Sequence, residues 1–193
     1  MAAPTFERIR PQEFAEWQLR QTQLYELVDG IPVVPLKMMA GATVRGDRVV
    51  VNCLLSLGSQ LRNKHCRPMT SDVAVRIPSG NYRRPDLTIE CGTPKSDRVI
   101  EATLPKVVIE VLSPSTISFD RFRKLEEYKT VAEIEVILMI DTEAAQVTIH
   151  RRRQRLWEAE TVEGLDAVIS FEGVIEAELA VRDIYEGLAF PSV

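Results

Sequence analysis

The chain has 193 residues, of which 45% are hydrophobic and 27% charged, and its formal net charge is −4. This length suits one globular domain, because single domains commonly span about 100–200 residues. The sequence lacks an apolar run of the roughly 20 residues that cross a bilayer, and its N-terminus lacks the apolar part of a secretion signal. The acidic balance argues against a non-specific nucleic-acid coat protein, although an enzyme with a local basic face stays open. We therefore expect a cytoplasmic protein that does not enter membranes.

The three cysteines, Cys53, Cys66 and Cys91, are odd in number and lack the spacing of a metal site. Because cysteine usage follows the redox compartment, we expect free thiols in a reducing cytoplasm.

Four elements are predicted in the first half of the chain. Pro11 to Gln21 has helical character, and residues 25–34 predict a strand, an Asp-Gly turn and a second strand. Apolar residues recur every three or four positions from Arg48 to Arg62, which indicates an amphipathic helix. From Met69 to Ile77 apolar residues alternate with polar ones, as in a strand.

Two strands and a charged helix follow. Asp86 to Cys91 predicts a strand, and Lys106 to Leu112 is a nearly continuous β-branched run that suits a strand buried on both faces. Asp120 to Thr130 predicts a helix. The apolar residues expected on one side of this helix are Phe122, Leu125 and Tyr128.

The last third predicts strands from Ile134 to Ile140 and from Gln146 to His150, then short strands and a helical turn from Val181 to Leu188. No linker or repeat divides the chain, so we expect one domain over residues 1–193. This alternation of helices and strands predicts an α/β fold with a mixed sheet flanked by helices.

Two carboxylates on neighbouring predicted strands indicate a candidate site for a divalent cation. Asp86 follows Pro85 at the start of one strand, and Glu110 lies inside an apolar strand, where an unpaired buried charge costs several kcal/mol. Mg²⁺ or Mn²⁺ held by Asp86, Glu110 and a backbone carbonyl near Val111 would provide a partner. A water activated by the cation suits phosphodiester hydrolysis, with Lys124 either stabilising the developing negative charge or orienting that water.

Each residue also has a structural explanation. Asp86 could be a turn acid, Glu110 could pair with an arginine at the margin of the core, and Lys124 could be a solvated helix lysine. Tyr128 could position Lys124, although filling the helix–sheet interface is the favoured role.

Several segments resemble the Uma-type restriction endonuclease family, a branch of the PD-(D/E)XK nuclease superfamily. They are RRPDLTIECG, VVIEVLSPST, DRFRKLEEYK and EVILMID, with YELVDG and DRVVVNCLLSLGSQLR upstream. The resemblance runs from about Tyr25 through Arg153. It implies a restriction-endonuclease-like core over about 48–153. The residue pattern places a helix and hairpin before this core, at about 10–36, and strands and a helix after it, at 155–193.

The resemblance also implies the site. Asp86 and Glu110 fall on the motif carboxylates of a divalent-metal site, and Lys124 matches a lysine that this branch carries on the following helix. Glu26 matches an acidic position that either reaches the same site or is solvated in its hairpin. Two departures stand against these matches: Leu112 replaces the usual lysine of the superfamily, and Gly46 stands where a histidine often precedes the first long helix.

Other polar residues could either contact phosphate or have a structural role. Ser113, Ser115 and Thr116 could meet phosphate oxygens, but a turn before the helix is favoured. Four basic clusters suit phosphate contacts or simply a soluble surface. These clusters are Arg62–Lys64, Arg83–Arg84, Arg121–Lys124 and Arg151–Arg153.

The favoured function is a Mg²⁺-dependent endonuclease that hydrolyses DNA. Because of Leu112 and Gly46, a nucleic-acid-binding protein without catalysis stays open. A third alternative is a homodimeric interaction module, because one fold can host many functions. A homodimer would also suit an enzyme that cuts two strands.

Overall fold

The computed structural model describes residues 7–35, 43–93, 96, 98–112 and 119–190. Its central feature is a six-stranded sheet in the order β10-β9-β8-β7-β6-β3. The bounds of these strands are β3 Arg67–Thr70, β6 Leu87–Glu90, β7 Pro105–Leu112, β8 Val136–Asp141, β9 Gln146–Arg153 and β10 Leu156–Glu163. Strands β7 and β8 run parallel and the other neighbours run antiparallel, so the sheet is mixed, as predicted.

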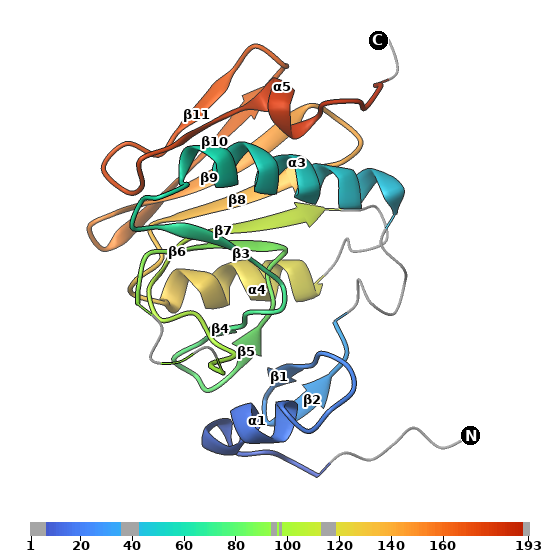
Figure 1. Cartoon of the computed structure of the whole chain (residues 1–193), viewed down its shortest axis with the longest axis vertical. Helices are drawn as coiled ribbons and strands as arrows, with labels where there is room; N and C mark the ends of the chain where they lie inside the picture. Colours follow the sequence, from blue (N-terminus) through green and yellow to red (C-terminus); the bar gives the residue numbers. More distant parts are fainter. Residues whose placement is uncertain (1–6, 36–42, 94–95, 97, 113–118, 191–193) are drawn as a thin grey trace.

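Two helices cover opposite faces of this sheet (Figure 1). Helix α3, Val44–Gln60, contributes Val49 and Cys53 to a core that includes Ile109. Helix α4, Phe119–Thr130, contributes Tyr128 to a second core that includes Val108. Successive residues of a strand point to opposite faces, so β7 is buried on both sides. The predicted α/β fold is confirmed.

A smaller sheet, ordered β2-β1-β5-β4, lies at the N-terminal end of the molecule (Figure 1). The bounds are β1 Glu26–Val28, β2 Ile31–Val33, β4 Val75–Arg76 and β5 Tyr82–Arg83, with α1 at Pro11–Gln18. The predicted hairpin is confirmed, and both of its turn residues have positive φ, 52° at Asp29 and 79° at Gly30. Asp-Gly suits this turn because glycine adopts such angles without steric cost.

The C-terminal segment packs beside α3 at the opposite end (Figure 1). It consists of β11 Val168–Ser170, β12 Glu178–Ala180 and α5 Val181–Ile184. The Asn52 amide of α3 donates to the backbone oxygens of Ile184 and Glu186, both at 3.0 Å. None of the helices in the described ranges is long and apolar enough to cross a membrane.

Three expectations for the fold are wrong. Met69 to Ile77 is not one strand, because β3 and β4 belong to different sheets. Phe122 does not share the buried side of α4, since it is 64% exposed. The C-terminal part does not contain only short strands, because β10 pairs with β9 over eight residues.

The cysteine expectation is also wrong in part. Cys66 and Cys91 form a disulfide, whereas Cys53 is free and buried. The two bonded residues directly flank the β3–β6 pair, in which Arg67 lies opposite Glu90. The strand register therefore brings together two thiols that are 25 residues apart in the sequence.

Candidate active site

Asp86 and Glu110 occupy neighbouring positions on paired strands. Leu87 of β6 lies opposite Ile109 of β7, so the next position along each strand places Asp86 beside Glu110. The Val111 N–H donates to Asp86 Oδ2 at 2.8 Å, and both carboxylate residues are half-buried. Burial and, to a smaller extent, the negative charge of Asp86 together raise the pKa of the Cys53 thiol to about 12.

Glu26 and Lys124 form a second part of the site. The Lys124 ammonium lies 2.8 Å from Glu26 Oε1, and the Glu26 side chain is only 2% exposed. Arg83 Nη1 donates to Glu26 Oε2 at 3.0 Å, and the Arg84 N–H donates to Oε1 at 3.0 Å. Solvation of Glu26 in its hairpin is therefore ruled out, because three donors surround a buried carboxylate.

The charge balance keeps Glu26 ionised. Burial alone would raise its pKa, but the positive charges of Lys124 and Arg83 outweigh this, and the pKa lies below its ordinary value. Strand pairing explains the contact with Arg83: Leu27 lies opposite Tyr82, so Glu26 and Arg83 are the next residues along the two strands. The structural explanation for Lys124 was a solvated helix lysine. Its side chain is only 13% exposed, so this explanation is wrong.

Arg83 connects this pair to a wider network. Its Nε donates to Glu127 Oε2 at 2.5 Å, and Asn81 and Arg123 donate to Glu127 Oε1 at 2.8 and 3.0 Å. Burial lowers the pKa of Arg83, but Glu127 and Glu26 raise it overall. Because Arg83 and Arg84 are each 1% exposed, this basic pair does not form a phosphate-contacting or solubilising surface.

The Tyr128 hydroxyl donates to Glu110 Oε1 at 2.6 Å. The ring is fully buried, as expected of a residue that fills the helix–sheet interface, but the contact with Glu110 was not predicted. An ionisable residue inside an apolar strand needs a hydrogen-bond donor, and this requirement was the sequence signal available. Arg121 is also near: burial lowers its pKa, opposed by the charges of Asp141 and Glu110.

The two departures from the family pattern have clear structural settings. Leu112 is 8% exposed and packs in the core between α4 and the sheet, so a lysine there would lose its hydration. Gly46 lies inside the first turn of α3, and its N–H donates to the capping Thr43 hydroxyl at 3.0 Å. Ser113, Ser115 and Thr116 lie outside the described residues.

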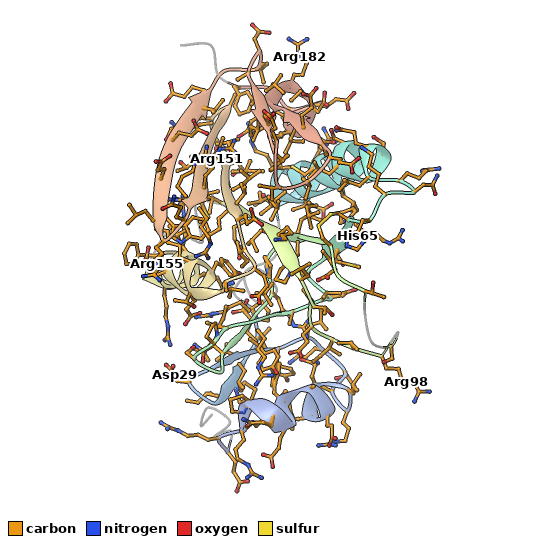
Figure 2. The ribbon with its side chains drawn as sticks, turned by 90° about the vertical axis from the view of Figure 1, so that its left-hand side faces the viewer. Asp29, His65, Arg98, Arg151, Arg155 and Arg182 are labelled. Atoms are coloured by element: carbon orange, nitrogen blue, oxygen red, sulfur yellow. A yellow bond between two sulfur atoms is a disulfide. The ribbon has the colours of Figure 1, made fainter. Side chains whose placement is uncertain are left out.

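The remaining basic residues are largely paired. Arg151 contacts Glu160 at 3.0 Å, and Arg152 donates to backbone carbonyls and stacks on Trp157. Arg151 and Arg155 lie on one side of the molecule and His65 on the other (Figure 2). His65 therefore lies away from Arg151 and Arg155.

The donor set fits a hard divalent cation. Within the described ranges, no group of three or more His, Cys, Asp or Glu side chains could hold a metal ion. Two carboxylates and a backbone carbonyl are nevertheless the oxygen ligands that Mg²⁺ and Mn²⁺ accept, with water completing the shell. The N–H and C=O of a strand residue point to the same edge, so the Val111 carbonyl faces the Asp86 side of β7.

The chain belongs to a family of nuclease-like proteins. Residues 11–182 match the sequence model of Uma2, described as a "putative restriction endonuclease". This membership confirms the resemblance seen in the sequence.

Relatives and a solved structure agree with this membership. Two uncharacterized proteins of Synechocystis sp. strain PCC 6803, slr1290 and sll1609, are each 25% identical to the chain, over 96% and 89% of its length and 95% and 97% of theirs. A crystal structure of a "putative nuclease belonging to DUF820" from Anabaena variabilis superposes with a TM-score of 0.68. It is 19% identical and covers 91% of this chain and 97% of its own. At that identity, the structural match supports the fold alone.

Proposed function

We propose that the chain is a single-domain, Mg²⁺- or Mn²⁺-dependent endonuclease that hydrolyses DNA phosphodiester bonds. The observation that carries the proposal is the adjacency of Asp86 and Glu110 on paired strands in a member of the Uma2 family. PD-(D/E)XK chemistry and a homodimer that cuts both strands belong to the same proposal. So does a cytoplasmic location, in which the Cys66–Cys91 disulfide would be an exception to the usual reduced state of thiols.

Each residue has a role in this proposal. Asp86, Glu110 and the Val111 carbonyl would hold the cation, which when bound supplies a Lewis acid and a water of lowered pKa. The Val111 N–H orients Asp86 through their 2.8 Å hydrogen bond. The Lys124 ammonium would stabilise negative charge on the phosphoryl oxygens.

Glu26 would act through Lys124. A lysine side chain has many rotamers, and the 2.8 Å contact with a buried carboxylate restricts the Lys124 ammonium to one region. Arg83 and the Arg84 N–H fix that carboxylate in turn. Glu26 is therefore proposed as a positioning residue, and Lys124 replaces the ammonium that Leu112 cannot supply.

The same ion pair also favours the second candidate, a DNA-binding protein without catalysis. If Glu26 holds Lys124 too tightly for it to reach a phosphate, the carboxylates would still bind a cation but no bond would be cut. Salt-dependent DNA binding without hydrolysis would then remain.

A plasmid-nicking assay with Mg²⁺ or Mn²⁺ separates the two candidates. Wild type should nick, and Asp86→Asn should lower the rate at least about 100-fold while keeping an oxygen that accepts the Val111 N–H. Asp166→Asn is the matched control, because Asp166 is 98% exposed and pairs with exposed Arg182.

Lys124→Ala should lower the nicking rate about 100-fold, whereas Lys129→Ala on the same helix should leave the rate unchanged. Wild type that binds DNA but never nicks it would refute the enzymatic function.

A further inference from the structure

The hydroxyl of Tyr128 donates a hydrogen bond to the carboxylate of Glu110. Tyr128 is 0% exposed, its ring packs in the core between α4 and the sheet, and its O–H donates to Glu110 Oε1 at 2.6 Å. Buried tyrosines normally find a partner for the hydroxyl, often a backbone carbonyl, as Tyr185 does with Asp141 O and Gln146 O at 2.8 Å. Tyr128 instead uses its donor on a residue of the candidate metal site.

The electrostatic surroundings keep this phenol protonated. Burial raises the pKa of Tyr128 well above its ordinary value, and the negative charges of Glu110 and Glu26 raise it further. The 2.6 Å hydrogen bond itself shows the hydroxyl acting as the donor to Glu110 Oε1. Tyr128 thus contacts Glu110 directly, and the charge of Glu26 also acts on its hydroxyl.

Helix α4 holds Tyr128 and Lys124 in a fixed arrangement. Tyr128 follows Lys124 by four residues on α4, which places the two side chains on the same face one turn apart. A rigid helix thus contributes one group to the Glu110 carboxylate and another to Glu26. Any shift of α4 along the sheet would move both contacts together.

We propose that Tyr128 is a positioning residue whose hydroxyl fixes the orientation of the Glu110 carboxylate for a divalent cation. Carboxylates that bind metals are commonly oriented by such outer hydrogen bonds, and loss of the partner typically weakens metal affinity about 10–100-fold. This inference rests on the proposed function, since it assumes that Glu110 binds a cation.

The test compares Tyr128→Phe with Tyr185→Phe. Both variants keep a buried ring and lose one hydroxyl, but only the first loses a donor to Glu110. Calorimetric titration with Mn²⁺ should show affinity at least about tenfold weaker for Tyr128→Phe and within about twofold of wild type for Tyr185→Phe. The Mn²⁺ concentration for half-maximal plasmid nicking should rise by a similar factor in Tyr128→Phe, with most of the rate recovered at saturating Mn²⁺.

The outcomes separate this inference from the function beneath it. Wild type that binds no Mn²⁺ would overturn the proposed site and the inference with it. Wild type that binds Mn²⁺ while Tyr128→Phe binds it equally well would overturn only the inference. If Tyr128→Phe does not fold, proton NMR of wild type decides: Mg²⁺ should shift the Tyr128 hydroxyl resonance, and no shift at saturation would overturn the proposal.

Discussion

Replacement of Glu26 by glutamine should destabilise the protein strongly, although the two side chains have almost the same shape. Glu26 is 2% exposed and accepts hydrogen bonds from Arg83 and the Arg84 N–H at 3.0 Å, with Lys124 at 2.8 Å. Removing one partner of a buried ion pair typically costs about 3–5 kcal/mol, because the other charge stays buried without compensation.

The expected loss for Glu26→Gln lies at the lower end, about 3 kcal/mol. Arg83 keeps its contact with Glu127, and Lys124, with 13% of its side chain exposed, retains some hydration. The assay is urea unfolding at about pH 7, with the free energy of unfolding extrapolated to water. Glu158→Gln is the matched control: it breaks a 3.5 Å pair with Arg153 in which both side chains are at least 64% exposed, so its cost should stay below about 1 kcal/mol.

The pH dependence gives a second check on the same variant. Because the folded pKa of Glu26 lies below its unfolded value, its stabilising contribution is complete above the unfolded pKa and is lost as pH falls toward the folded pKa. The difference in the free energy of unfolding between wild type and Glu26→Gln should therefore narrow as the pH falls from about 7 to below the unfolded pKa of about 4.3. A difference below about 1 kcal/mol at neutral pH, or one that widens in acid, would refute the reasoning.

Two further variants test other parts of the structure. Cys66→Ser should lower the free energy of unfolding by about 3.5 kcal/mol, the chain-entropy effect of releasing a link across 25 residues. In urea unfolding, a reductant should lower the free energy of unfolding of wild type by the same amount and leave that of Cys66→Ser unchanged. Leu112→Lys, which restores the usual superfamily lysine, should cost about 3 kcal/mol or more and give no gain in plasmid nicking, because position 112 is buried among apolar side chains. A stable and more active Leu112→Lys would show that the site can use that position after all.

Local signals predicted much of the fold. The Asp-Gly hairpin, the amphipathic helix and the β-branched strand are each specified by neighbouring residues, and each is present as β1–β2, α3 and β7. The single strand predicted from Met69 to Ile77 is wrong because alternation of apolar and polar residues does not indicate which sheet a strand joins. Here the chain leaves one sheet after Thr70 and enters the other at Val75.

The candidate site was predictable only in part. Asp86 and Glu110 stand out because each is a carboxylate beside or within an apolar strand, and the antiparallel register places them side by side. Contacts that depend on tertiary packing could not be derived from spacing, including those of Lys124 with Glu26 and of Tyr128 with Glu110. The burial of Arg83 was hidden for the same reason, because only the fold shows that its charge is balanced by two carboxylates.

The most direct test of the central claim is calorimetric titration of Mn²⁺ into wild type, Asp86→Asn and the Asp166→Asn control. If Asp86 and Glu110 form a cation site, wild type and Asp166→Asn should bind Mn²⁺ alike, and Asp86→Asn should bind it at least about tenfold more weakly. Equal binding by all three proteins, or no binding by wild type, would contradict the proposed site.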